Sequence, residues 1–262
     1  MEIERYQLWA EEDMVARSGS GRGTFTSCIP GMDFYPSGSG NSERGCVIVC
    51  PGGGYKYKTM SYEGRDIALF LNDNGLDAFV LDYRLAPDTH PAPLNDALRA
   101  VEMARQLAPE LGYDSGKIGI MGFSAGGHLA ASAGTMWNKP ENRPDAMILC
   151  YPVITMGNKY THPDSRANLM GENINESTIG DLSCENRVSK QTPPAFIWHT
   201  VSDQSVHVEN SILFASALTA KSVPYEMHLF PEGRHGLGLA SDVEGACEWS
   251  GLCIKWLKRM GF

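Results

Sequence analysis

The 262-residue chain is 42% hydrophobic and 20% charged, an ordinary composition for a globular protein, and its length suits one large α/β domain. Its formal net charge of -9 argues against a nucleic-acid-binding protein, which usually presents a clustered basic face. No apolar stretch approaches the roughly 18 residues of a membrane span, so we expect no membrane partner.

The N-terminal stretch MEIERYQLWAEEDM is acidic and lacks a basic region followed by an apolar one, so we do not expect a signal peptide. The seven cysteines are odd in number and show neither a disulfide framework nor the spacing of zinc ligands. We therefore expect reduced thiols that are buried as small hydrophobic residues, and a cytoplasmic location.

Short β-branched runs alternate with longer helical stretches along the chain. Strands are predicted over residues 46–50, 77–83, 117–122, 146–151, 195–200 and 225–230. Helices are predicted over residues 62–75, 93–107 and 207–221, from Ala125, and from about Asp242 to the end. This alternation implies a mostly parallel sheet with helices on both faces, in which functional sites form outside the carboxyl ends of the strands.

We expect residues 1–262 to form a single domain of this α/β class. The glycine- and serine-rich residues 17–31 are interpreted as turns between early strands. Residues 155–191 are polar, with few aromatic residues, and are a candidate lid insertion suited to a hydrophilic substrate.

Ser124 is the candidate nucleophile. It lies in the sequence GFSAGG, directly after a predicted strand and before a helix rich in alanine and glycine. A sharp strand-to-helix turn forces the serine into an unfavourable backbone region, so Gly122 and Gly126 must be small. The free N–H groups at the start of the helix favour negative charge that develops near the hydroxyl.

A serine hydroxyl needs a base, and His235 is the candidate among seven histidines because it follows the last predicted strand and has glycines close by. Asp203, just after the preceding strand, is the candidate acid that orients the histidine. Asp242 and Glu232 are its rivals. The remaining histidines lie mostly within predicted elements and are interpreted as structural, except for two that remain open as substrate contacts, namely His162 and His207.

The sequence CPGGGYKY at residues 50–57 follows an early strand and can bring backbone N–H groups close to a reacting carbonyl oxygen. We assign Gly53, Gly54 and Ala125 as the donors of an oxyanion hole. Three aromatic residues near the strand ends are candidate substrate contacts, although residues in such places more often pack in the core, namely Tyr55, Tyr57 and Trp198. No metal ion or organic cofactor is expected.

These motifs, in the order Ser124, Asp203, His235, resemble those of the α/β-hydrolase superfamily, specifically the acetyl xylan esterase and feruloyl esterase-like enzymes and the hormone-sensitive-lipase-like small esterases. The resemblance extends from about residue 45 to the C-terminus and implies an α/β-hydrolase fold. Lipase-like relatives commonly have a histidine where this chain has Pro51, so another group must hold the oxyanion loop. They also commonly read GDSAGG where this chain reads GFSAGG.

The resemblance implies a serine carboxylesterase that removes small acyl groups, most readily acetyl, from carbohydrate esters such as acetylated xylo-oligosaccharides. The alternatives are an amide or formamide hydrolase of the arylformamidase type and a general short-chain carboxylesterase. A non-catalytic ligand-binding protein is disfavoured because such proteins typically lose the histidine. An apolar stripe on the final helix, residues 244–260, leaves a homodimer open.

Overall fold

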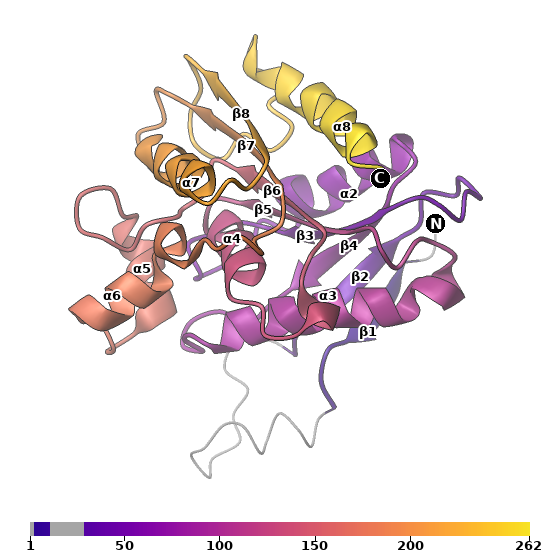
Figure 1. The fold of residues 1–262 in the computed structure, drawn as a ribbon, viewed down its shortest axis with the longest axis horizontal. Coiled ribbons are helices and arrows are strands. Elements are labelled where there is room, and N and C mark those ends of the chain that lie inside the picture. Colours follow the sequence, from indigo (N-terminus) through magenta and orange to yellow (C-terminus); the bar gives the residue numbers. More distant parts are fainter. Residues whose placement is uncertain (1–2, 11–28) are drawn as a thin grey trace.

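The computed structural model describes residues 3–10 and 29–262, which form one eight-stranded sheet between layers of helices (Figure 1). The strand order is β1-β2-β4-β3-β5-β6-β7-β8; β1 and β2 pair in antiparallel fashion and the strands from β3 to β8 are parallel. The strands are β1 Glu4–Gln7, β2 Gly31–Tyr35, β3 Cys46–Cys50, β4 Asp77–Asp82, β5 Ile118–Phe123, β6 Ala146–Cys150, β7 Ala195–Thr200 and β8 Tyr225–Phe230.

Helices cover both faces of the sheet, as the alternating pattern predicts. They are α2 Asp66–Asp73, α3 Ala92–Leu111, α4 Ala125–Thr135, α5 Pro163–Met170, α6 Glu176–Leu182, α7 Glu209–Ala220 and α8 Trp249–Arg259. The buried residues of α2 and α8 belong to one hydrophobic cluster, and those of α3, α4 and α7 belong to the other. The two clusters therefore lie on opposite faces of the sheet (Figure 1).

The central strand β3 shows why helices must pack on both faces of the sheet. All five of its residues are buried, with Val47 and Val49 in the cluster of α2 and α8 and Ile48 in the opposite cluster. Burying one such side chain stabilises the fold by about 1.5–3 kcal/mol. The all-apolar run CVIVC is thus the pattern of a strand that is covered on both faces.

The parallel register brings two predicted motifs together. Strand β3 pairs with β5 so that Cys50 lies opposite Gly122. The chain therefore leaves β3 into the PGGGY loop beside the point where it leaves β5 into the GFSAGG turn. This is the carboxyl edge of the sheet, where the α/β fold predicts its site.

Two expectations about local structure need correction. The C-terminal helix α8 begins at Trp249 and not near Asp242, because Gly245 with φ 81° interrupts the chain and a short 3-10 turn, Ala246–Glu248, intervenes. The predicted helix over residues 62–75 begins as a π-helical turn, Ser61–Arg65. The turns expected over residues 17–31 lie largely outside the described residues.

The candidate lid, residues 155–191, contains α5, α6 and a short 3-10 helix, Cys184–Arg187. In Figure 1, α5 and α6 lie together at one end of the molecule, beyond the sheet. Leu169, Leu182 and Val188 anchor the segment in the main hydrophobic cluster. Its role as a lid stays a prediction.

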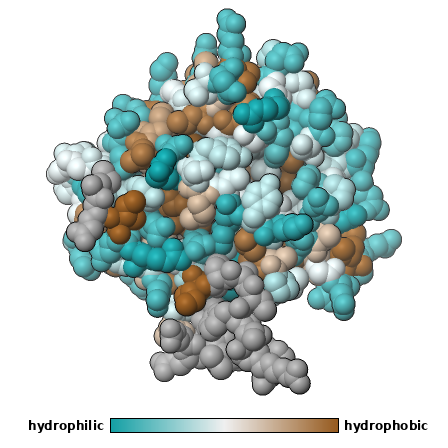
Figure 2. All heavy atoms as spheres, turned by 180° about the vertical axis from the view of Figure 1, so that it is seen from behind, coloured by the Kyte–Doolittle hydropathy of each residue, from teal (hydrophilic) through white to brown (hydrophobic). Residues whose placement is uncertain are grey.

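Within residues 3–10 and 29–262, no helix is long and apolar enough to cross a membrane. On the face shown in Figure 2, hydrophobic side chains are scattered among hydrophilic ones. The apolar stripe of α8 packs against the sheet, since Cys253, Ile254 and Leu257 are buried in the cluster that α8 shares with α2.

Candidate active site

Ser124 occupies the strained turn that its motif predicts. It joins β5 to α4 with φ 55° and ψ -118°, a region that costs a non-glycine residue on the order of 1–3 kcal/mol. The flanking glycines are required by close backbone contact. A β-carbon on Gly122 would lie 2.0 Å from the carbonyl oxygen of Gly126, and one on Gly126 would lie 2.1 Å from that of Cys50.

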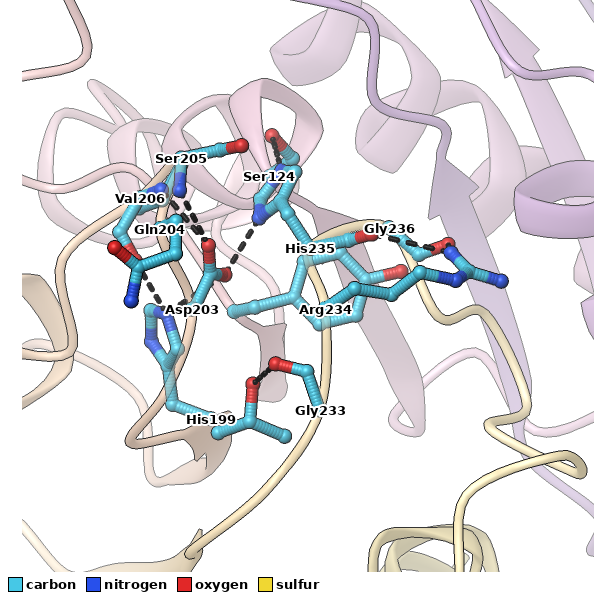
Figure 3. A network of polar contacts seen from close by, with 12 residues as sticks. Ser124, His199, Asp203, Gln204, Ser205, Val206, Gly233, Arg234, His235 and Gly236 are labelled. Carbon is cyan, nitrogen blue, oxygen red and sulfur yellow. Dashed lines mark hydrogen bonds and ion pairs between the residues drawn. The ribbon is translucent and has the colours of Figure 1, made fainter.

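The structure brings Ser124, His235 and Asp203 into one chain of hydrogen bonds (Figure 3). Nδ1 of His235 lies 2.6 Å from Oδ2 of Asp203, and Nε2 of His235 lies 2.7 Å from Oγ of Ser124. Because a carboxylate only accepts, Nδ1 carries the proton and Nε2 is left to accept the serine proton. This arrangement can activate a hydroxyl as a nucleophile.

Asp203 is held as a carboxylate from several sides (Figure 3). Its Oδ1 accepts the backbone N–H groups of Ser205 at 2.8 Å and Val206 at 3.0 Å, and its Oδ2 also lies 3.4 Å from Nε2 of His199. Burial alone would raise the pKa of Asp203, but hydrogen bonds from His199 and His235 outweigh burial and hold that pKa well below its ordinary value. The acid is therefore ionised and fixed in direction.

The rival acids do not take this place. Asp242 is exposed and lies 3.7 Å from Arg234, and neither Asp242 nor Glu232 contacts His235 in the described part of the chain. His199, which we interpreted as structural from its place within a strand, is buried beside the acid and contacts it.

The direction of each proposed oxyanion donor is set by its own peptide unit. In each unit, the carbonyl of the preceding residue accepts hydrogen bonds that fix the orientation of the N–H. The carbonyl of Gly52 accepts from the N–H of Thr59 at 3.0 Å, and that of Gly53 accepts from the N–H groups of residues 56 and 57, each at 3.1 Å. In a trans peptide the N–H points opposite to the carbonyl, so the N–H groups of Gly53 and Gly54 point away from these partners.

The third donor follows the same geometry. The carbonyl of Ser124 accepts from the N–H groups of His128 at 3.1 Å and Val153 at 3.0 Å, which directs the N–H of Ala125 away from them. None of the described residues accepts a hydrogen bond from the N–H groups of Gly53, Gly54 or Ala125. These three N–H groups are thus unpaired, and Gly53 and Gly54 line the same pocket as Ser124.

Glu63 holds the oxyanion loop in this protein. It takes over the task of the histidine that lipase-like relatives commonly have at the position of Pro51. It is 2% exposed; its Oε2 accepts the N–H of Gly52 at 2.9 Å and the hydroxyl of Thr59, and its Oε1 accepts the hydroxyl of Tyr151 at 2.6 Å. The hydroxyl of Tyr83 also donates to the carbonyl of Pro51 at 2.7 Å. Sequence reasoning missed Glu63, because its distance from Gly52 along the chain carries no motif.

Tyr151 connects Glu63 to the histidine loop. Its hydroxyl donates to Glu63 and accepts the N–H of Gly238 at 2.8 Å, and its ring lies edge-on to His235 with 5.1 Å between centroids. Burial and the neighbouring Glu63 raise the pKa of Tyr151 well above its ordinary value. The phenol therefore keeps its proton and acts as a fixed donor.

A pocket of about 260 Å³ opens onto Ser124 and His235. Its other walls are formed by Gly53, Gly54, Lys56, Tyr57, Thr59, Tyr62, Glu63, His162, Asp164, Asn168, Ser205 and Gly236. Most of these side chains are polar, and the rings of Tyr57 and Tyr62 are exposed. A larger hollow of about 670 Å³ borders Trp9 and Glu102 and contains none of the predicted site residues.

Two predicted aromatic contacts are wrong. Tyr55 is 1% exposed, because its hydroxyl binds Nδ1 of His128 at 2.8 Å inside the core. Trp198 is fully buried and stacks on Trp249 with ring centroids 4.9 Å apart. Of the three aromatic candidates, Tyr57 lines the pocket.

Of the two histidines that the sequence left as candidate substrate contacts, only one lies at the pocket. His162 lines the pocket, whereas His207 lies against Tyr160, with 6.0 Å between ring centroids, and does not line it. Within the described ranges no group of three or more histidine, cysteine or acidic side chains is arranged to hold a metal ion.

Known proteins resemble this chain in sequence and in fold. A family model named BD-FAE matches residues 32–218. The endo-1,4-beta-xylanase B of Butyrivibrio fibrisolvens is 43% identical over 94% of this chain and 40% of its own length, and the acetylxylan esterase of Xylanibacter ruminicola is 34% identical over 77% of this chain and 42% of its own. The chain thus spans about two fifths of the length of these relatives.

Two solved structures match over nearly their whole length. The acetyl ester-xyloside bifunctional hydrolase from Caldicellulosiruptor lactoaceticus superposes with a TM-score of 0.91 at 42% identity, covering 99% of this chain and 97% of that one. The carboxylesterase Cest-2923 from Lactobacillus plantarum gives a TM-score of 0.77 at 26% identity, covering 100% and 98%. The predicted α/β-hydrolase fold and esterase family are therefore confirmed, and the chain belongs to the BD-FAE family of α/β-hydrolases.

Proposed function

We propose that the protein is a serine esterase that removes acetyl groups from carbohydrate esters such as acetylated xylo-oligosaccharides. The observation that carries this proposal is the hydrogen-bonded chain from Ser124 through His235 to Asp203, next to unpaired backbone donors and a polar pocket. The relatives named for acetylxylan ester and acetyl ester-xyloside hydrolysis support the choice of acyl group and alcohol.

The geometry suggests how the reaction proceeds. Nε2 of His235 takes the hydroxyl proton of Ser124 as its Oγ attacks the acetyl carbonyl carbon, and the developing oxyanion accepts from the N–H groups of Gly53, Gly54 and Ala125. Asp203 stabilises the imidazolium that forms. The histidine then gives its proton to the departing sugar oxygen, and the acetyl group stays on the serine.

The second half of the reaction reverses these roles. A water molecule takes the place of the departed sugar and gives its proton to His235 while it attacks the acetyl carbonyl. The tetrahedral intermediate uses the same donors, and it collapses when Ser124 leaves with the proton from the histidine. Acetate is the product, and the enzyme returns to its starting state.

The pocket favours a small acyl group and a hydrophilic alcohol. A volume of about 260 Å³ leaves little room for a long acyl chain beside a sugar, and most of the lining side chains offer hydrogen bonds. The exposed rings of Tyr57 and Tyr62 at its wall suit the apolar face of a sugar ring.

The test is acetate release from acetylated xylo-oligosaccharides by the wild type and by Ser124→Ala, with p-nitrophenyl esters of increasing acyl length and an N-formyl arylamine as comparison substrates. We expect serine-dependent release of acetate from the sugar, and p-nitrophenyl ester turnover that falls with acyl length. Faster turnover of the formamide than of the acetylated sugar would overturn the proposal in favour of an amide hydrolase, and uniform turnover of long esters would favour a general carboxylesterase.

The location and assembly of the protein stay predictions. Buried, unpaired cysteines such as Cys46, Cys150 and Cys253 support a reducing, cytoplasmic environment. Fractionation of cells that produce the protein would test the location, and light scattering of the purified chain would test for a homodimer.

A further inference from the structure

His162 is held in one protonation form by an unusual helix cap. It is the N-cap residue of α5, and its Nδ1 accepts the backbone N–H of Ser165 at 3.2 Å and lies 2.8 Å from the hydroxyl oxygen of the same residue. A backbone N–H can only donate, so Nδ1 carries no proton. The neutral ring must then carry its proton on Nε2.

This Nε2–H is open to the catalytic pocket. His162 lines the same pocket as Ser124 and His235, and among residues 3–10 and 29–262 nothing accepts from Nε2, which is not enclosed. A β-carbon built on Gly54 would lie 4.0 Å from Cε1, the ring carbon between the two nitrogens. Burial, and secondarily the nearby His235, lower the pKa of His162, which keeps the ring neutral.

The same helix supplies acceptors next to this donor. Nδ2 of Asn168 donates to the carbonyl of Gly54 at 2.8 Å, which leaves its Oδ1 as an acceptor at the pocket wall. The carboxylate of Asp164 lines the pocket as well. A sugar hydroxyl both donates and accepts, so a wall with one fixed donor and adjacent acceptors matches neighbouring hydroxyl groups.

We propose that Nε2–H of His162 donates a hydrogen bond to the hydroxyl oxygen on the carbon next to the one that carries the ester, so that the enzyme selects acetyl esters of vicinal diols. The inference rests on the proposed function. When the acetyl carbonyl lies between Ser124 and the N–H of Gly54, the leaving oxygen remains in this pocket. The hydroxyl on the neighbouring carbon is within a hydrogen-bonding distance of that oxygen, and His162 is the side chain closest to a β-carbon at Gly54 apart from Ser165.

Two substitutions separate the cap from the donor. In His162→Asn the side-chain oxygen can take over the cap, since asparagine is a preferred N-cap residue, but the side chain is too short to place a donor where Nε2 lies. In His162→Gln the amide nitrogen can reach the position of Nε2, whereas the cap is lost. Asn175→Ala is the matched control, because it removes the cap of α6, in the same segment, from a residue outside the pocket.

The probes are 2-hydroxycyclohexyl acetate and cyclohexyl acetate, which differ in the vicinal hydroxyl. For each enzyme we take the ratio of the two kcat/KM values. An effect of a substitution on the chemical step that both esters share cancels in this ratio. We expect the wild type and Asn175→Ala to prefer the hydroxy ester about tenfold, His162→Gln to retain most of that preference, and His162→Asn to lose it. The same loss is expected for a monoacetylated xyloside relative to cyclohexyl acetate.

An unchanged ratio in a folded His162→Asn would overturn the role of His162 while leaving the esterase proposal intact. Equal loss of the ratio in both His162 variants would also overturn the donor, because His162→Gln keeps an amide N–H that reaches the position of Nε2. Loss of the ratio in His162→Gln alone would assign the effect to the helix cap. Failure of the wild type to release acetate from any acetylated sugar would instead remove the proposed function, and this inference with it. Circular dichroism and thermal unfolding, which we expect to match the wild type in His162→Asn, establish that each variant is folded.

Discussion

The two walls of the catalytic pocket are built differently. The wall formed by residues 51–63 carries two of the three proposed oxyanion donors, Gly53 and Gly54, and its carbonyl and N–H groups are fixed by buried partners such as Glu63 and Tyr83. The wall formed by α5 and its N-cap presents half-buried side chains that each keep one polar atom open, namely Nε2 of His162 and Oδ1 of Asn168. We propose that the rigid wall serves the bond-making step, which every ester substrate shares, and that the open wall selects the alcohol.

The largest effect is expected at the acid, Asp203, which belongs to neither wall and orients His235 from behind. In Asp203→Asn the amide can donate to Nδ1 of His235 and so favour the wrong tautomer, and we expect kcat to fall about 10⁴-fold. Asp242→Asn is the matched control, because this exposed acid contacts Arg234 instead of the histidine. Steady-state kinetics with p-nitrophenyl acetate measures both variants, and similar kcat values for the two would contradict the assignment of the acid.

The second effect concerns His128, which connects the oxyanion loop to the segment of residues 155–191. Its Nδ1 binds the hydroxyl of Tyr55 from the oxyanion loop, and its Nε2 binds the carbonyl of Leu182 at the end of α6. Burial lowers the pKa of His128 to about 4, against about 6.5 for an ordinary histidine. The folded state therefore requires the neutral ring, and the unfolded state takes up the proton first as the pH falls.

The sign of the pH dependence follows from this difference. The contribution of His128 to stability is fully present above about pH 6.5 and is lost as the pH falls toward 4, with a total on the order of 3 kcal/mol. Urea unfolding of the wild type and of His128→Asn at several pH values measures it. We expect the free energy of unfolding of the wild type to fall more steeply than that of the variant in this range, and parallel curves would contradict the buried neutral histidine.

The third effect tests how the oxyanion loop is held. In Glu63→Gln an amide group must face either the N–H of Gly52 or the hydroxyl of Tyr151, so at least one anchor of the loop is lost. We expect kcat to fall about 30-fold with little change in KM, because misplaced oxyanion donors affect the transition state. Asp77→Asn is the control, since Asp77 is also buried and accepts a backbone N–H, from Ser37, at the opposite end of the strands. An equal loss in both variants would reduce the role of Glu63 to general stability.

The smallest effect is expected where the open wall contacts the rigid one. Asn168→Ala removes the hydrogen bond to the carbonyl of Gly54, and we expect kcat/KM for p-nitrophenyl acetate to fall about fivefold. Asn173→Ala, in the same segment but outside the pocket, is expected to behave as the wild type. A 100-fold fall in kcat/KM for Asn168→Ala would contradict the distinction between the walls, because it would show that α5 holds the oxyanion loop as firmly as Glu63 does.

The sequence predicted the chain of Ser124, His235 and Asp203 better than it predicted the two walls of the pocket. Strands alternate with helices, and the residues that follow parallel strand ends must meet at one edge, which was enough to bring Ser124, Asp203 and His235 together in the correct order. Their glycine neighbours add a steric signal, since a β-carbon at Gly126 would meet the carbonyl oxygen of Cys50. Local sequence therefore carries this part of the site.

The remaining parts depend on contacts that no local pattern encodes. Glu63 reaches Gly52 from a helical turn, and His199 reaches Asp203 from inside a strand. The orientation of His162 depends on the hydrogen bond that its Nδ1 accepts from the N–H of Ser165. Tyr55 was misplaced for the opposite reason, because its motif suggests a pocket residue whereas its backbone, with φ 57°, turns the ring into the core. Such side chains can be assigned only when their neighbours in space are known.

The most direct test of the central claim is to catch the acetyl group on Ser124. The wild type and Ser124→Ala are mixed with excess p-nitrophenyl acetate, quenched in acid after milliseconds to seconds, and analysed by peptide mass spectrometry. We predict an acetyl adduct on the peptide that contains Ser124 in the wild type, appearing together with the first turnover, and no adduct in Ser124→Ala. Full ester turnover by Ser124→Ala, or an adduct on a different residue that forms at the rate of turnover, would contradict the account.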